Sequence, residues 1–149
     1  MPGFRQWLNT ALQETGDSLD ADSKAALEHL DTPDWPSDPE QAQQLKDVIK
    51  PLAAHYLLKE KNAKGLPLNP VARFHLGNGA QLHRINWLGD TSGKGLHQAA
   101  GLMVNYLYVL EDIERNHEKY TTHGTIACSS GVRDLDRRAR KLLKGDTVK

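Results

Sequence analysis

Three of the chain's seven prolines fall within the nine residues 31–39, and this cluster constrains the fold more than any other feature. Proline fixes the backbone angle φ and has no N–H group to donate, so neither a helix nor an inner strand can run through such a segment. We therefore expect a loop here that separates two helical stretches.

Apolar residues spaced three and four apart predict helices over most of the remaining chain. The expected helices cover residues 3–14, 23–30, about 38–61, 70–77, 111–119 and 133–143, with a further short helix within 90–100. Five signals mark their ends or interruptions: Asp22 as an N-cap, Ser37 with Glu40 as a capping box, Pro51 as a kink or break, Asn69-Pro70 as N-cap and first helical position, and Asn78-Gly79 as a stop.

Two strands are expected late in the chain, at residues 82–88 and 102–110. The second run is apolar on both faces, which favours a strand buried on both sides. The fold class is therefore α+β with more helix than strand, and a chain of 149 residues has the length of one domain.

Composition excludes several classes of protein. The 19 basic and 19 acidic residues cancel, whereas polyanion-binding proteins carry a cationic excess. Apolar runs are too short to span a membrane, so neither nucleic acid nor membrane is an expected partner. One cysteine, Cys128, cannot form a disulfide framework. With no signal peptide visible, we expect the cytoplasm.

The charge is unevenly distributed, because basic residues gather in the last 18 positions. The basic side chains concerned are Arg133, Arg137, Arg138, Arg140, Lys141 and Lys144. A solvated helix face is the simpler interpretation of this run and the one we favour. A phosphate-contacting patch is the alternative, although the run lacks the interleaved aromatic residues of a nucleic-acid groove.

His75 is the histidine placed on an apolar helix face, four residues after Val71 and beside Phe74. Such a histidine is usually a core residue with its hydrogen bonds satisfied. Near a helix C-terminus, however, the dipole favours the imidazolium while burial opposes it, and a group so balanced can act as an acid–base catalyst.

Asn86 and Asn105 are polar residues within the two apolar strands. Each side chain either bonds to a neighbouring backbone group or points into a ligand pocket. Tyr106 and Tyr108 carry the same ambiguity.

Three separated motifs occur in this order: Asn-Pro-Val-Ala-Arg-Phe-His-Leu-Gly-Asn-Gly-Ala at 69–80, Arg-Ile-Asn-Trp at 84–87 and Gly-Leu-Met-Val-Asn-Tyr at 101–106. Together they closely resemble the C-terminal part of malonyl-CoA decarboxylase. The resemblance extends through nearly the whole chain, and Pro2-Gly-Phe4 is similar to the end of that family's Ser-Pro-Ile-Pro-Gly-Phe motif.

The resemblance implies an acetyltransferase-like (GNAT) fold that converts malonyl-CoA to acetyl-CoA and carbon dioxide, with no metal and no organic cofactor. It also implies a catalytic serine–histidine pair whose histidine corresponds to His75. Asn86, Asn105 and Tyr108 match motif positions and are expected to support the substrate pocket.

The same resemblance places the family's serine two residues before the position of Met1, so residues 1–149 are expected to form a single, incomplete domain. Two hypotheses follow. Either the chain is the catalytic C-terminal portion of a decarboxylase that needs its N-terminal half, or it is a non-catalytic fragment that binds an acyl-CoA or a partner subunit. Because a partial sheet exposes strand edges, self-association into a homo-oligomer is also expected.

Overall fold

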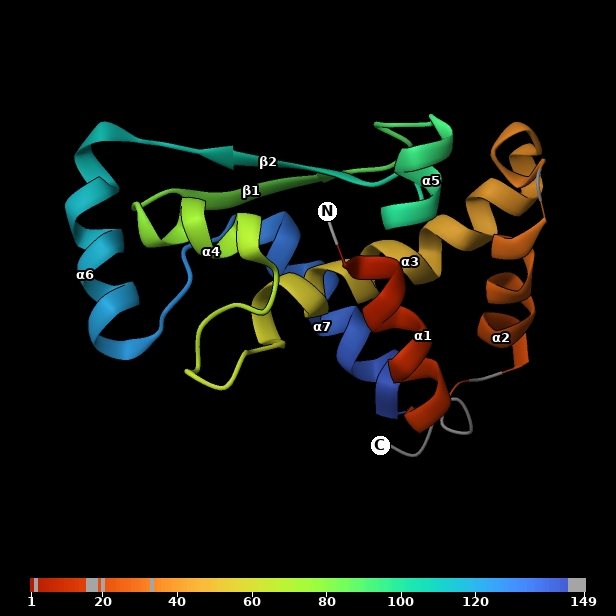
Figure 1. The fold of residues 1–149 in the computed structure, drawn as a ribbon, viewed down its shortest axis with the longest axis horizontal. Helices are drawn as coiled ribbons and strands as arrows, with labels where there is room; N and C mark the ends of the chain where they lie inside the picture. Colours follow the sequence, from red (N-terminus) through yellow and green to blue (C-terminus); the bar gives the residue numbers. More distant parts are fainter. Residues whose placement is uncertain (2, 16–18, 20, 33, 145–149) are drawn as a thin grey trace.

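The computed structural model describes residues 1, 3–15, 19, 21–32 and 34–144, which form helices around a small antiparallel sheet (Figure 1). This arrangement confirms the α+β class and the excess of helix. The helices are α1 (Phe4–Thr15), α2 (Ala21–Glu28), α3 (Pro39–Lys59), α4 (Pro70–Gly77), α5 (Gly93–Ala99), α6 (Ile113–His123) and α7 (Ser130–Lys144), and the strands are β1 (Gln81–Asn86) and β2 (Met103–Leu107). Short 3₁₀ turns occur at His29–Asp31, Trp35–Ser37 and Leu110–Asp112.

Helix α3 is the centre of the hydrophobic core. Its fully buried side chains recur at helical spacing and include Leu45, Ile49 and Leu52. Helix α7 packs along α3 through Val132, Asp136 and Ala139, which are four and three residues apart and therefore share one face. The basic residues described on α7 lie on its exposed faces, as expected for a solvated helix.

The start of α3 differs from the capping box expected at Ser37. Asp38 is the N-cap, and its carboxylate accepts hydrogen bonds from the main-chain N–H groups of Glu40 (3.0 Å) and Gln41 (3.2 Å). Pro39 explains the shift, because its fixed φ suits the first helical position and makes the preceding residue the cap. Ser37 lies instead in a 3₁₀ turn of the proline-rich loop.

Helix α3 is not divided at Pro51, contrary to one of the two outcomes expected. The proline removes one main-chain hydrogen bond from the helix. It is itself buried, and both halves of the helix bury apolar side chains in the same core, so packing favours a single helix across the gap.

Asp22 is also not the N-cap of α2, because the helix already includes Ala21 and places Asp22 in its first turn. A carboxylate there still faces the positive end of the helix dipole. The other helices fall where the sequence predicts them, with ends displaced by a few residues: α6 extends to His123, and α7 begins at Ser130.

Strands β1 and β2 pair antiparallel, with Ile85 opposite Val104 and Asn86 opposite Met103. A register shift between Leu82 and Arg84 adds one residue to β1, as in a β-bulge. Figure 1 shows both strands along one side of the molecule, with α4 beneath β1 and α6 at one end.

The expectation that the second strand is buried on both faces is wrong. Met103 is 48% exposed and Leu107 39% exposed, while the alternating Val104 and Tyr106 are partly buried. Helices cover one face of the pair, and no described residue covers the other. The apolar run of the sequence therefore includes surface residues.

A further extended segment on the other edge of β1 was not expected. The N–H of Leu82 donates to the carbonyl oxygen of Ala127 at 2.8 Å, and the N–H of Ser129 donates to Leu82 at 3.1 Å. These bonds make a parallel bridge between Leu82 and Cys128. One edge of β1 is thus occupied by β2 and the other by the segment leading into α7.

Candidate active site

Helix α4 positions His75, and its sequence explains both of its ends. The Asn69 side chain accepts a hydrogen bond from the N–H of Ala72 at 3.0 Å, and Pro70 occupies the first turn, as expected. At the other end, Gly79 adopts φ +93°, which glycine tolerates far better than other residues. His75 therefore lies in the last turn, half-buried, as the sequence predicts.

Two tyrosines from the end of β2 hold the His75 ring. The Nδ1 atom of His75 lies 2.7 Å from the hydroxyl oxygen of Tyr108, within hydrogen-bonding distance. The ring also stacks on Tyr106 with centroids 4.6 Å apart and planes inclined by 21°. Nδ1 is occupied, and no described side chain bonds Nε2, so Nε2 is the ring atom free to meet a reacting group.

Burial raises the pKa of Tyr106, which keeps its hydroxyl neutral at physiological pH. A neutral tyrosine presents an uncharged face to the stacked imidazole. The sequence left open whether Tyr106 points into a ligand pocket, and only Tyr108 was assigned to the site; their spacing of two puts both on the same side of an extended chain.

Asn86 and Asn105 form a second pair, apart from His75. The Nδ2 of Asn86 donates to the Oδ1 of Asn105 at 2.9 Å. Asn105 precedes Tyr106 in β2, so the asparagines lie on the outer face of the sheet while the His75–Tyr106 contact lies on the inner side. The side chains bond to each other rather than to the backbone, an arrangement that neither alternative anticipated.

The serines that the structure describes do not pair with His75. Ser92 accepts the N–H of Gly95 and caps α5. Ser129 donates to the carbonyl of His83 and accepts from the N–H of Val132 at the start of α7. These hydroxyls stabilise helix ends, and no described serine hydroxyl forms a hydrogen bond with the imidazole.

Exposed hydrophobic side chains occur on the helix of His75 and after β2. They are Val71 (40% exposed) and Phe74 (65%) on α4, and Tyr108 (41%) and Leu110 (84%) after β2. Phe74 also meets the His75 ring edge-on at a centroid distance of 5.2 Å. Single exposed apolar residues are common, but Phe74 is both largely exposed and in contact with the imidazole, so it indicates an interaction surface beside His75.

No group of three or more histidine, cysteine or acidic side chains in the part of the chain that the structure describes could hold a metal ion. Likewise, none of the described helices is both long and apolar enough to cross a membrane.

Comparison with known proteins identifies the family to which this arrangement belongs. The family model of the malonyl-CoA decarboxylase C-terminal domain matches residues 1–146. The chain belongs to the malonyl-CoA decarboxylase family. It is 36% identical to the mitochondrial malonyl-CoA decarboxylases of Anser anser anser, over 151 residues, and Rattus norvegicus, over 154 residues. These alignments cover 89% and 91% of the chain but only 30% and 31% of the relatives.

Solved malonyl-CoA decarboxylases show the same relation in three dimensions. The Rhodopseudomonas palustris structure matches with a TM-score of 0.86 and 52% identity over 90% of the chain, which is 31% of that structure. The Agrobacterium vitis structure gives 0.83 and 47%, again over 90% of the chain and 33% of its own. The chain thus spans about a third of the malonyl-CoA decarboxylases that it matches.

Proposed function

We propose that this chain provides the histidine half of a malonyl-CoA decarboxylase active site, with His75 as its catalytic residue. The observation that carries the proposal is the His75 ring, held at Nδ1 by Tyr108 and stacked on Tyr106, with Nε2 left free. The upstream part of a malonyl-CoA decarboxylase would supply the serine, in the same chain or in another.

The reaction would convert malonyl-CoA to acetyl-CoA and carbon dioxide. The bond between the carboxylate carbon and the α-carbon breaks, carbon dioxide leaves, and the bonding electrons move into the thioester as an enolate. Protonation of the α-carbon then gives the acetyl thioester. Because the thioester carbonyl accepts the electrons, the chemistry needs polarisation of that oxygen, a poorly solvated carboxylate and one proton donor.

In this scheme Nε2 of His75 orients and polarises the serine hydroxyl and takes part in the proton transfer. The contact between Nδ1 and Tyr108 fixes the direction of Nε2, as an orienting partner does for catalytic histidines in general. Phe74, Val71 and Leu110 supply apolar surface that would exclude water once the missing part of the site covers them.

The position of α1 supports this assignment of the serine. The resemblance puts the serine just ahead of α1, and Figure 1 shows the start of α1 beneath the sheet, between α4 and α5. A Cβ on Gly3 would lie 3.0 Å from the hydroxyl of Tyr56, whose oxygen is 3.5 Å from Nδ2 of Asn69, the cap of α4. The beginning of α1 thus lies close to Tyr56, which in turn contacts the cap of the His75 helix.

The acetyltransferase-like fold and the single, incomplete domain belong to the same proposal. The free edge of β2 would pair with a strand of the upstream part by main-chain hydrogen bonds. Tyr108 would then support the substrate pocket beside His75, and Asn86 and Asn105, on the outer face of the sheet, would support it through the added structure. Homo-oligomer formation and a cytoplasmic location stay predictions.

A non-catalytic fragment that binds only an acyl-CoA or a partner subunit is the second candidate. It is favoured by the described serines, none of which pairs with His75. Both candidates predict association with the upstream part, so activity of the complex decides between them.

The test adds the N-terminal remainder of the Rhodopseudomonas palustris enzyme to the purified chain and measures acetyl-CoA release from malonyl-CoA. We expect release from the mixture and from neither component alone. His75→Ala should abolish it, while His97→Ala, an exposed histidine on α5, should not. Formation of a complex with no release of acetyl-CoA would favour the non-catalytic candidate, and equal release from both variants would refute the role of His75.

A further inference from the structure

A second concentration of polar groups lies between α3 and α7, away from His75. A hollow of about 490 Å³ opens between the end of α3, residues 124–128 and α7. Four cationic side chains line it: Lys59 and Lys61 from one wall, and Arg133 and Arg140 from the other. The chain as a whole has no net charge, so this accumulation is local.

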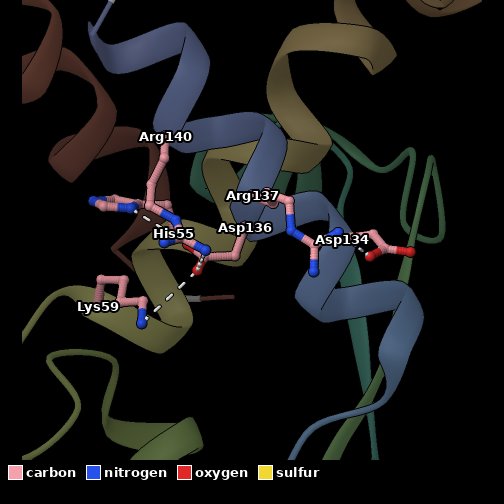
Figure 2. Close-up of polar contacts among 6 residues, drawn as sticks. All are labelled: His55, Lys59, Asp134, Asp136, Arg137 and Arg140. Atoms are coloured by element: carbon pink, nitrogen blue, oxygen red, sulfur yellow. Dashed lines mark hydrogen bonds and ion pairs between the residues drawn. The ribbon is translucent and has the colours of Figure 1, made fainter. Parts of the chain in front are cut away.

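Asp136 compensates two of these cations. Its side chain is 3% exposed, and one carboxylate oxygen lies 3.8 Å from Nζ of Lys59 and 3.7 Å from the guanidinium of Arg140. The other oxygen faces Nδ1 of His55 at 3.6 Å (Figure 2). The carboxylate is therefore already shared between Lys59 and Arg140, with His55 beside it.

Lys61 and Arg133 are left without a counterion among the described residues. The pKa of Lys61 is lowered by burial and, second, by the neighbouring charge of Lys59. Arg133 also lines an adjacent hollow of about 380 Å³ that contains Lys119 and Arg115, the latter paired with Asp112. Arg133 therefore lies where the two hollows meet.

We propose that the hollow between α3 and α7 binds a phosphate monoester, with Arg133 and Lys61 as its principal contacts. The planar guanidinium of Arg133 can donate two parallel hydrogen bonds to a phosphate, and Lys61 adds a point charge. The hollow is larger than a phosphate ion, so part of the organic group fits as well. This inference does not depend on the proposed decarboxylase function, because the hollow shares no lining residue with the surroundings of His75.

Cys128 provides a direct probe, because it lines both hollows and is the sole cysteine of the chain. The experiment measures the rate at which iodoacetamide alkylates Cys128, at constant ionic strength, with increasing inorganic phosphate, coenzyme A or 3′-dephospho-coenzyme A. We expect saturable protection by phosphate or by coenzyme A. Protection by coenzyme A but not by its dephosphorylated form identifies the 3′-phosphate as the ligand group, and protection by inorganic phosphate identifies a free phosphate site.

Substitutions distinguish a specific phosphate site from nonspecific attraction by surface charge. Arg133→Gln and Lys61→Gln should each raise the dissociation constant about tenfold, the effect of losing one charged hydrogen bond. Lys141→Gln removes an equal charge from an exposed position of α7 outside the hollow and should change the constant less than about twofold. Circular dichroism would establish that all three remain folded. Equal weakening by Lys141→Gln, or no protection of Cys128 by any of the three probes, would overturn the proposal.

Discussion

Gly79 controls how the His75 helix meets β1, and we expect Gly79→Ala to destabilise the protein strongly. The residue adopts φ +93°, in the region where side chains are strained. A Cβ at this position would lie 2.5 Å from the carbonyl oxygen of Ile113 and 2.8 Å from its Cγ2. The turn is also tied to α6 by Asn116, which donates to the carbonyl of Gly79 at 3.0 Å. The backbone therefore has no easy way to move aside.

Gly65 offers a matched control, because it has a similar φ of +78° but nothing within 4 Å of the added Cβ. Backbone strain of about 1–2 kcal/mol should apply to both substitutions. Only Gly79→Ala adds the steric conflict with Ile113, for which overpacking costs of about 1–3 kcal/mol are typical. The expected losses are therefore about 1–2 kcal/mol at Gly65 and about 2–5 kcal/mol at Gly79.

Thermal and urea unfolding of the two variants test this reasoning. For a chain of this length, about 1 kcal/mol corresponds to about 3 °C in Tm, so we expect Gly79→Ala to melt roughly 3–9 °C below Gly65→Ala. Equal melting temperatures would show that α6 yields to the extra methyl group. The tight contact between the His75 turn and α6 would then not be a constraint on the site.

Three further substitutions test other parts of the structure. Tyr108→Phe removes the hydroxyl that contacts His75 and should lower the turnover of the reconstituted complex about fivefold, as expected for one lost hydrogen bond, while leaving its assembly unchanged; unaltered turnover would contradict the orienting role. Burial raises the pKa of Tyr106, so above about pH 10 this tyrosine loses its proton more readily in the unfolded chain than in the folded one, and the free energy of unfolding falls as pH rises. Tyr106→Phe should therefore lose less stability than the unmodified chain between about pH 9 and about pH 11; parallel losses would refute this. Asp136→Asn should lower the free energy of unfolding in urea by about 1–2 kcal/mol, a loss limited by the exposure of its partners Lys59 and Arg140 (Figure 2). Asp134→Asn, on a 63% exposed side chain, should change it by less than about 0.5 kcal/mol, and equal losses would refute the role of burial.

Local signals in the sequence predicted α4 and its histidine well. Asn69 as cap, Pro70 in the first turn and glycine at the end act over a few residues, so their effect does not depend on the rest of the fold. The error at the start of α3 is also local: Ser37 and Asp38 both can cap a helix, and the neighbouring Pro39 decides between them. Predicting the first residue of such a helix requires a comparison of neighbouring residues that could each act as the N-cap.

Contacts between distant segments were beyond the reach of the sequence patterns. The pairing of His75 with Tyr108 spans 33 residues, and the bond between Asn86 and Asn105 depends on a register that includes the shift near Leu82. A one-residue change of register would move Asn86 to the opposite face. Periodicity can place these residues on strands and helices, but it cannot select which side chains meet.

The exposed face of β2 was not predicted for the same reason: periodicity does not show which segments pack against a strand. Apolar residues at 102–110 predict burial, and the described structure buries only one side of the strand. Apolar residues in a sequence include those that become buried only in the complete family protein, whereas the structure of one segment shows only the residues that this segment buries by itself. The residues in which the two differ, Met103, Leu107 and Leu110, are therefore where the upstream part of a decarboxylase is expected to pack. Phe74 is exposed beside His75 on the other side of the sheet, so completing the catalytic site would require that this second surface be covered as well.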